Sequence, residues 1–443
     1  MYRNIYWCTA VAVLLGNPLN ALAANDTDPQ SLGEQIRQLK QSNARLEQRL
    51  QQDEDAAVQA PARSSAPPSS VNSFNPAVSM VLSGTYEQLQ RDPAIPVTGF
   101  AMNANNTGYT RGFSLQESEL GIAADIDPLF RGVGTFSLAP EGGIAVENAF
   151  VQTSALGNGL NLEFGRFFSD LGYLNDQHSH VWDFVDQPLV YRVMWDNQLA
   201  EDGMQLKWLA PTDMFIEIGG EAGRGLDFPG TNRQNKNGTG AGVLFAHIGD
   251  DVGIENSWRA GVSLHETRRE NAVSNAVDSL GMPTGLTNSF TGDSRTAGLD
   301  FVWKYSPNGN IRERYLKVQS EYFRRRENGL LTDSLANTGS YAVTQSGWYL
   351  QSVYQFMPDW RTGVRYDRLD SGNAGLGATF APGIVSNYAF HPTRLTWMAD
   401  YNASEFSRIR LQLAHDDSRQ GLADNQLFLQ YIMALGAHGA HQY

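Results

Sequence analysis

Segments in which apolar and polar residues alternate recur from about residue 78 to residue 435. One of the clearest has Ile409, Leu411 and Leu413 in alternation with Arg410 and Gln412. A side-chain period of two with one apolar face predicts a β-strand that contacts water on one side only. We count sixteen such segments, which begin near residues 78, 113, 131, 145, 159, 203, 213, 239, 254, 294, 311, 344, 360, 392, 406 and 425.

The links between these segments alternate in length. Links after even-numbered segments are tight turns such as Met357-Pro358-Asp359, whereas those after odd-numbered segments are mostly long and polar. The long links are expected at 88–112, 168–202, 224–238, 267–293, 326–343 and 371–391. Short turns on one rim and long loops on the other are typical of outer-membrane β-barrels. The last strand is expected to finish close to Tyr443.

So many apolar stripes could not all be buried in a water-soluble core of this length. A soluble β-sandwich or propeller is the alternative, but contact with lipid suits the stripes and barrel closure satisfies every backbone group. The predicted fold class is therefore all-β, a 16-stranded antiparallel transmembrane β-barrel preceded by a short N-terminal coiled-coil helix. We assign the barrel to residues 77–443.

Three short regions precede the predicted barrel. Residues 1–23 have the order of an export signal, with Arg3, an apolar run and then Ala21-Leu22-Ala23 before the cleavage point. Residues 29–55 contain a heptad seam formed by Leu32, Ile36, Leu39, Asn43, Leu46 and Leu50, which predicts a periplasmic coiled coil or, alternatively, a frayed amphipathic helix. Residues 56–76 form a linker rich in proline, serine and alanine.

Composition narrows the class of protein. The 443 residues contain 33 lysines and arginines against 47 acidic residues, a net charge of −14, and hydrophobic residues make up only 41%. These values exclude a polytopic helical membrane protein and argue against nucleic-acid binding, which depends on basic surface. Cys8 is the one cysteine and lies within the export signal, so the mature chain would have no thiol. That suits an oxidising envelope compartment. We expect the bacterial outer membrane, with the coiled coil in the periplasm.

One stretch resembles a known family. The residues from Gly165-Arg166-Phe167-Phe168 through Asp202-Gly203-Met204-Gln205-Leu206 look like the phosphate-selective porin O/P family, and the order of elements resembles trimeric Gram-negative porins with an N-terminal coiled coil. The resemblance implies a homotrimer of sixteen-stranded pores, each narrowed by an infolded loop. Phosphate selection in that family depends on a lumen with many lysines. This chain has five lysines, so phosphate specificity is not expected here.

The link 168–202 is unusually apolar for an exposed loop, so we expect it to pack inside the barrel and constrict it. Opposed charges across a narrow opening would orient passing solutes. The polar groups available to line the constriction are Asp176, His178, His180, Asp183, Asp186 and Arg192. Arginines that alternation turns inward could line the lumen or form salt bridges that brace the barrel: Arg259, Arg361, Arg365, Arg394, Arg408 and Arg410.

Two features allow further interpretations. His178 and His180, near aspartates, resemble a divalent-metal ligand set, and His438 and His441 form a second pair in the tail; hydrogen-bonded loop histidines are the alternative. The arginines at 268–269 and 324–326 could contact lipopolysaccharide phosphates or simply be solvated.

No enzyme signature is found in the sequence, so we expect no enzymatic activity. The predicted function is that of an outer-membrane porin for diffusion of small hydrophilic solutes or ions. The alternatives are a zinc-linked uptake or receptor protein, and a structural barrel with a blocked pore. The expected partners are a homotrimer, outer-membrane lipid and lipopolysaccharide, and a small solute.

Overall fold

The computed structural model describes residues 76–103, 109–138, 142–225, 227–230, 236–277, 283–378, 380 and 390–436. The predicted export signal, the coiled coil at 29–55 and the linker up to residue 75 lie outside the described residues. So does the tail from residue 437 onward, with His438, His441 and the expected aromatic end of the last strand.

Eighteen strands form in the described residues, and all their pairings are antiparallel. Their bounds are β1 Ala77–Leu89, β2 Gly112–Leu115, β3 Ser118–Asp125, β4 Phe130–Leu138, β5 Ile144–Thr153, β6 Leu160–Phe168, β7 Ala200–Leu209, β8 Phe215–Gly223, β9 Ala241–Val252, β10 Asn256–Val277, β11 Pro283–Tyr305, β12 Tyr315–Asp333, β13 Thr338–Met357, β14 Trp360–Asp370, β15 Gly375–Leu376, β16 Thr393–Ser404, β17 Ser407–Asp417 and β18 Asp424–Gly436. Two of them, β2 and β15, have only four and two residues.

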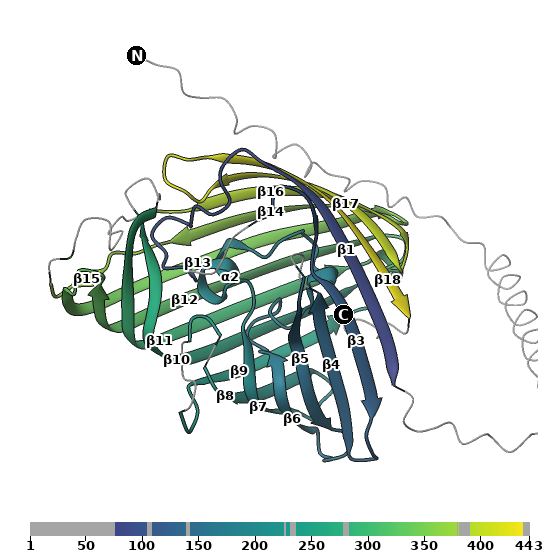
Figure 1. The fold of residues 1–443 in the computed structure, drawn as a ribbon. Helices are drawn as coiled ribbons and strands as arrows, with labels where there is room; N and C mark the ends of the chain where they lie inside the picture. Colours follow the sequence, from purple (N-terminus) through teal and green to yellow (C-terminus); the bar gives the residue numbers. More distant parts are fainter. Residues whose placement is uncertain are drawn as a thin grey trace, which may run out of the picture. The chain divides into compact units, whose positions relative to one another are not determined.

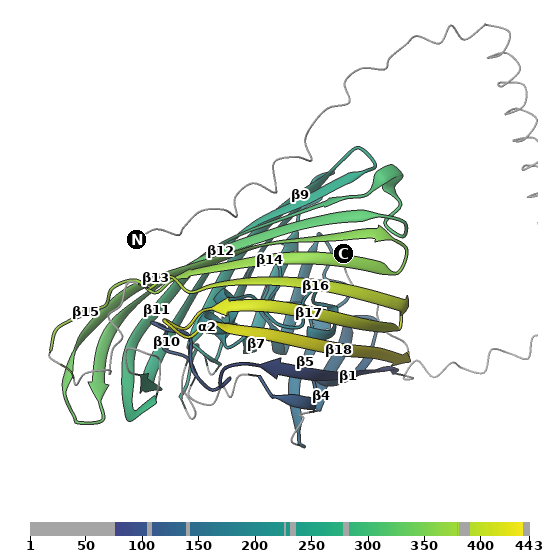
Figure 2. The same ribbon diagram turned by 90° about the horizontal axis from the view of Figure 1, so that it is seen from above.

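The other sixteen strands form a closed ring. Each pairs with the next long strand in the chain, β1 with β3 and β14 with β16 across the two short ones. The ring closes where β18 pairs with β1, from Ser79 opposite Gly436 to Leu89 opposite Gln426. Figures 1 and 2 show the strands wrapping around a central space in two perpendicular views. The predicted sixteen-stranded antiparallel barrel is confirmed.

The sixteen long strands present apolar side chains outward over part or all of their length. On β17, Ile409, Leu411 and Leu413 are exposed, whereas Arg410 and Gln412 between them are fully buried. The neighbouring strands continue the pattern, because Leu411 lies opposite Leu429 of β18 and Ala399 of β16. A surface of this kind suits contact with hydrocarbon, and the ring leaves no unpaired edge. Among the described residues, no helix is both long and apolar enough to cross a bilayer.

Two predicted loops are wrong. Most of 267–293 belongs to β10 and β11, strands of 22 and 23 residues, and β12 and β13 likewise extend through most of 326–343. The ladder continues there with few interruptions; Arg269, for example, lies opposite Gly292. The outward face of these strand ends carries mainly charged and polar residues such as Arg268 and Arg295, whereas the inward face carries the apolar cluster Ala272, Ala276, Phe290 and Leu331. The outward apolar alternation that marks a lipid-facing strand is therefore missing from the sequence.

Candidate functional site

The inner segment, residues 169–199 between β6 and β7, contains two short helices, η1 (Ser179–Val181) and α2 (Leu189–Trp195). Pro188 precedes α2, where its fixed φ suits a helix start, and Asp196 ends the helix in a left-handed conformation with φ of 54°. All seven residues of α2 are buried. Figures 1 and 2 both show α2 within the ring of strands.

Apolar side chains of this segment pack against apolar side chains that point inward from the wall. The ring of Phe323 on β12 contacts Tyr191 and Trp195, with ring centroids 5.4 Å and 4.7 Å apart. Burial of each such side chain stabilises the folded protein by about 1.5–3 kcal/mol relative to leaving it exposed to water. The same cluster contains Leu171, Leu174, Leu189, Val190, Val193, Met194 and Leu199 from the segment, with Val243, Phe245, Tyr349 and Leu369 from the wall.

Asp186 is the main polar anchor of the segment. Its carboxylate accepts from Arg365 of β14 at 2.8 Å and lies 2.6 Å from the guanidinium of Arg394 of β16; the hydroxyl of Tyr109 also donates to it. The arginine side chains are 1% and 0% exposed. Burial alone would raise the pKa of Asp186, but the charges of Arg394 and Arg365 outweigh it and hold that pKa below its usual value.

Asp183 forms a second anchor. It ion-pairs with Lys317 of β12 and, at 3.4 Å, with Arg361 of β14. Burial opposes ionisation of Asp183, but these two cations outweigh it and lower its pKa. Arg361 also ion-pairs with Asp400 of β16. The Asp400 carboxylate accepts a hydrogen bond from Arg410 of β17 at 2.8 Å, so the network joins four strands of the wall, β12, β14, β16 and β17.

Hydrogen bonds to the backbone of the segment complete its attachment. Arg410 donates to the carbonyl of Trp182 at 2.8 Å. In the other direction, the N–H of Val185 donates to the side chain of Gln412 at 2.8 Å and the N–H of Leu189 to Asp367 at 3.0 Å. The segment is therefore fixed to β14 and β17 by its backbone as well as by its charges.

The structure brings together most of the residues that the sequence analysis selected. Asp183 and Asp186 meet five of the six predicted arginines directly or through Asp400, namely Arg361, Arg365, Arg394, Arg408 and Arg410. All of these except Arg408 are buried. Arg408 is 22% exposed and donates to the carbonyl of His180 at 3.4 Å.

Arg192, Asp176 and Arg259 remain among the charged residues that the sequence predicts. Arg192 is buried and donates at 3.0 Å to Tyr109, which in turn donates to Asp186. Asp176 is exposed and experiences the charges of Arg259 and Lys207. Arg259 is half-buried, with its guanidinium 5.3 Å from the centre of the Tyr173 ring. Asp176 and Arg259 thus stand apart from the buried arginine network.

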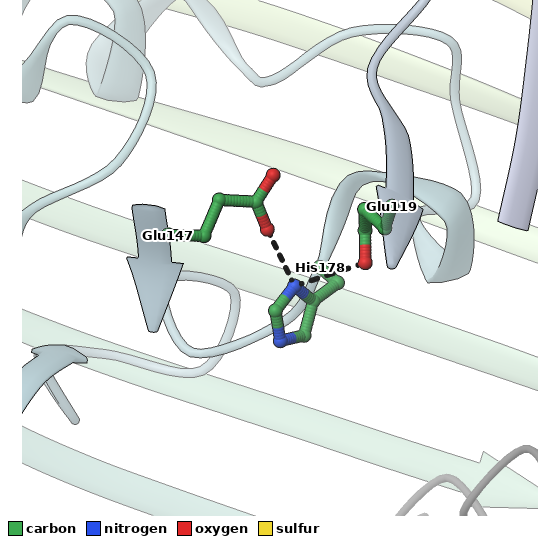
Figure 3. Close-up of side chains that lie close together, drawn as sticks. All are labelled: Glu119, Glu147 and His178. Atoms are coloured by element: carbon green, nitrogen blue, oxygen red, sulfur yellow. Dashed lines mark hydrogen bonds and ion pairs between the residues drawn. The ribbon is translucent and has the colours of Figure 1, made fainter. Parts of the chain in front are cut away.

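His178 and His180 contact a group of glutamates. His178 Nδ1 lies 2.9 Å from Glu147 Oε2 and 3.3 Å from Glu119 Oε2, and His180 Nδ1 lies 2.9 Å from Glu119 Oε1. Figure 3 shows His178 between Glu119 of β3 and Glu147 of β5. Glu117, just before β3, lies beside Glu147; burial and that charge raise the pKa of Glu117 to about 8. An imidazole with carboxylates is a donor set that divalent metals accept.

Sequence reasoning missed several partners of the selected residues. Apart from Asp400 and Arg410 on the neighbouring strands β16 and β17, each is far from its partner in the chain. The strand register and the path of the segment bring the partners together. Alternation could have placed some of these side chains inside the barrel, but no motif marks any of them: Tyr109, Glu119, Glu147, Lys317 and Asp400.

Comparisons with known proteins identify a related sequence and solved structures with a similar fold. An uncharacterised protein of Aquifex aeolicus is 30% identical over 352 residues, which cover 75% of this chain and 70% of the relative. No family model matches the sequence.

Two solved structures of OmpT, an outer membrane protein of Vibrio cholerae, share the fold. A form lacking loop L8 has a TM-score of 0.52, and a trimer form folded in vitro has 0.50. Each is 12% identical and covers 81% of this chain and 99% of its own. An anion-selective porin from Comamonas acidovorans has a TM-score of 0.49 at 11% identity, covering 81% of this chain and 99% of the porin.

Proposed function

We propose that this chain, which belongs to the same family as the uncharacterised Aquifex aeolicus protein, is an outer-membrane porin. It forms a water-filled channel for diffusion of small hydrophilic solutes or ions, and the segment 169–199 constricts that channel. The observation that carries the proposal is the reversal of polarity across the wall: Leu411 and Leu413 face outward while Arg410 and Gln412 face inward. Such a wall suits lipid on one side and a polar lumen on the other.

The constriction is proposed to leave an aqueous path on the side of the barrel away from β14 and β17. The segment covers the arginines of those strands, whereas wall residues of β7, β8 and β10 keep solvent contact. Lys207 is 28% exposed and Glu217 20%, and Arg259 is half-buried. Asp176 is exposed on the segment side and experiences the charges of Arg259 and Lys207. Opposed charges in a narrow opening would produce a transverse field that orients solutes.

We also propose a homotrimer, with the coiled coil at 29–55 assisting its assembly. The similar Vibrio cholerae protein is described in a trimer form, which supports this arrangement. Deletion of residues 24–73 is expected to weaken or delay trimer formation while leaving the barrel folded. Native mass spectrometry of the full and shortened chains measures this; loss of the barrel itself would contradict the assignment of a separate assembly helix.

Ion conductance in planar bilayers tests the channel. We expect the purified trimer to conduct, Asp176→Arg to move the reversal potential in a salt gradient toward anion selectivity, and Arg259→Glu to move it toward cation selectivity. Asp125→Arg is the matched control because Asp125 ends β3 at an exposed turn, with its side chain 71% exposed. A trimer that conducts no ions would favour the structural barrel with a blocked pore.

A further inference from the structure

Three elements bring potential metal ligands to one point. Glu119 comes from β3, Glu147 from β5 and His178 from the segment that runs inside the barrel, and one ligand atom of each lies within 4.8 Å of the others. In a tetrahedral zinc site with bonds of roughly 2.0–2.1 Å, neighbouring ligand atoms are about 3.3 Å apart. His178 Nδ1 lies 3.3 Å from Glu119 Oε2 and 2.9 Å from Glu147 Oε2, so small shifts would admit an ion (Figure 3).

Acidic side chains surround this point. Glu117 lies beside Glu147, so three carboxyl groups gather around His178 and His180. In the part of the chain that the structure describes, no lysine or arginine ion-pairs with Glu117 or Glu147. The Glu147 side chain is only 8% exposed, and the side chains of Glu117 and Ser137 hydrogen-bond with it. A metal ion would bind this buried carboxyl group more strongly than those neutral or acidic neighbours do.

We propose that Glu119, Glu147 and His178 bind a divalent transition-metal ion, with zinc as the test ion, which clamps the segment to β3 and β5. Mixed imidazole and carboxylate ligands favour zinc-like ions over calcium, which prefers oxygen ligands alone. His178 is 24% exposed, so an ion can enter from the lumen. The clamp lies on strands that the Asp183 and Asp186 anchors do not contact, and the site would bind metal whether or not the barrel conducts.

Asn148 lies beside the ring nitrogen of His178 that faces away from the proposed metal ion. Its Nδ2 lies 3.1 Å from His178 Nε2, while its Oδ1 accepts the N–H of Phe168 at 3.1 Å. Metal on Nδ1 leaves a proton on Nε2, which then needs an acceptor. In Asn148→Asp, a carboxylate could accept from both Nε2–H and Phe168 N–H, and we expect zinc to bind about 10-fold to 100-fold more tightly.

Isothermal titration of zinc, and separately of calcium, into the detergent-solubilised full chain tests the site. The protein is purified without a polyhistidine tag and carries His438→Ala and His441→Ala, which remove the second histidine pair. We expect one zinc per chain, weaker or absent calcium binding, at least about 100-fold weaker zinc binding in His178→Ala and Glu147→Gln, and tighter binding in Asn148→Asp. His391→Ala, at a 46% exposed histidine, is the matched control and leaves binding unchanged.

Absence of stoichiometric zinc binding to the starting protein would overturn the proposal, as would equal binding in His178→Ala and Glu147→Gln. Glu147→Gln preserves side-chain volume, and heat-modifiable migration in gels verifies that each variant keeps the barrel. Failure of zinc binding with normal conductance refutes the metal site alone. Zinc binding without conductance refutes the channel alone.

Discussion

Asp186→Ala removes the carboxylate that pairs the inner segment (residues 169–199) with two arginines of the wall. The substitution takes the ion-pair partner from both Arg365 and Arg394 and the acceptor from Tyr109. With the segment in place, two guanidiniums that are 1% and 0% exposed would face an apolar methyl group. With the segment released, water could solvate both. The substitution therefore shifts the equilibrium toward release.

The magnitude follows from the contacts that remain. Loss of one partner of a buried ion pair costs about 3–5 kcal/mol. Arg365 keeps Asp367 at 3.1 Å, and Arg394 keeps a hydrogen bond to Gln426 at 2.8 Å. Because these contacts remain, we expect the segment to lose about 3 kcal/mol of attachment free energy, which increases the released population roughly 100-fold.

Hydrogen exchange followed by mass spectrometry measures this population. We expect amides of residues 183–189 to exchange about 100-fold faster in Asp186→Ala, and amides of β16 and β17 to be unaffected, because release is local. Asp125→Ala is the control, since Asp125 and Arg131 form an exposed pair worth at most about 1 kcal/mol. Equal exchange in Asp186→Ala and the control would refute the assignment of Asp186 as an anchor.

Three further predictions concern the wall, the anchors and the backbone of the inner segment. Leu411→Arg places a charge on the lipid-facing side, and urea titration in vesicles should show that the free energy of unfolding falls by up to about 2–4 kcal/mol. An unchanged free energy of unfolding would contradict lipid contact. Because the pKa values of Asp183 and Asp186 are lowered, their stabilisation is complete above the unfolded pKa of about 4 and is lost as pH falls through the folded pKa. Exchange of the amides of residues 183–186, corrected for intrinsic rates, should thus be constant from about pH 5 to 8 and faster only in strong acid; faster exchange of these amides near pH 6 would contradict this. Gly172 has φ of 73°, and a Cβ there would meet Glu321, so Gly172→Ala should lower thermal stability by about 1–3 kcal/mol; an unchanged melting temperature would contradict it.

The fold was predictable wherever lipid imposes a pattern. Ile409, Leu411 and Leu413 face hydrocarbon and must be apolar, and strands such as β17 could therefore be located to within a few residues. Residues 267–293 and 326–343 of β10 to β13 also pair in the barrel, but their outward face carries mainly polar and charged residues. Nothing in composition separates such a hairpin from a loop, and the sequence therefore predicts loops at 267–293 and 326–343 where the structure has strands.

The candidate site was predictable only in part. Alternation places Arg365 and Arg394 inside the barrel, and the apolar character of the inner segment predicts that it leaves the surface. The pairing of those arginines with Asp186 depends on the path of the segment through the barrel. The same is true of Glu119 and Glu147 around His178, since their meeting depends on strand register. Residue spacing along the chain carries no signal for contacts of this kind.

Quenching of tryptophan fluorescence by brominated lipid tests most directly whether hydrocarbon covers the outer wall while the segment lies inside. Trp397 and Trp360 are 40% and 42% exposed on the outer face, whereas Trp195 is 1% exposed inside. In reconstituted protein, Trp397→Phe and Trp360→Phe should each reduce the quenchable fraction of the emission, and Trp195→Phe should reduce only the unquenchable fraction. Equal loss of quenchable emission from Trp195 and Trp397 would contradict this arrangement.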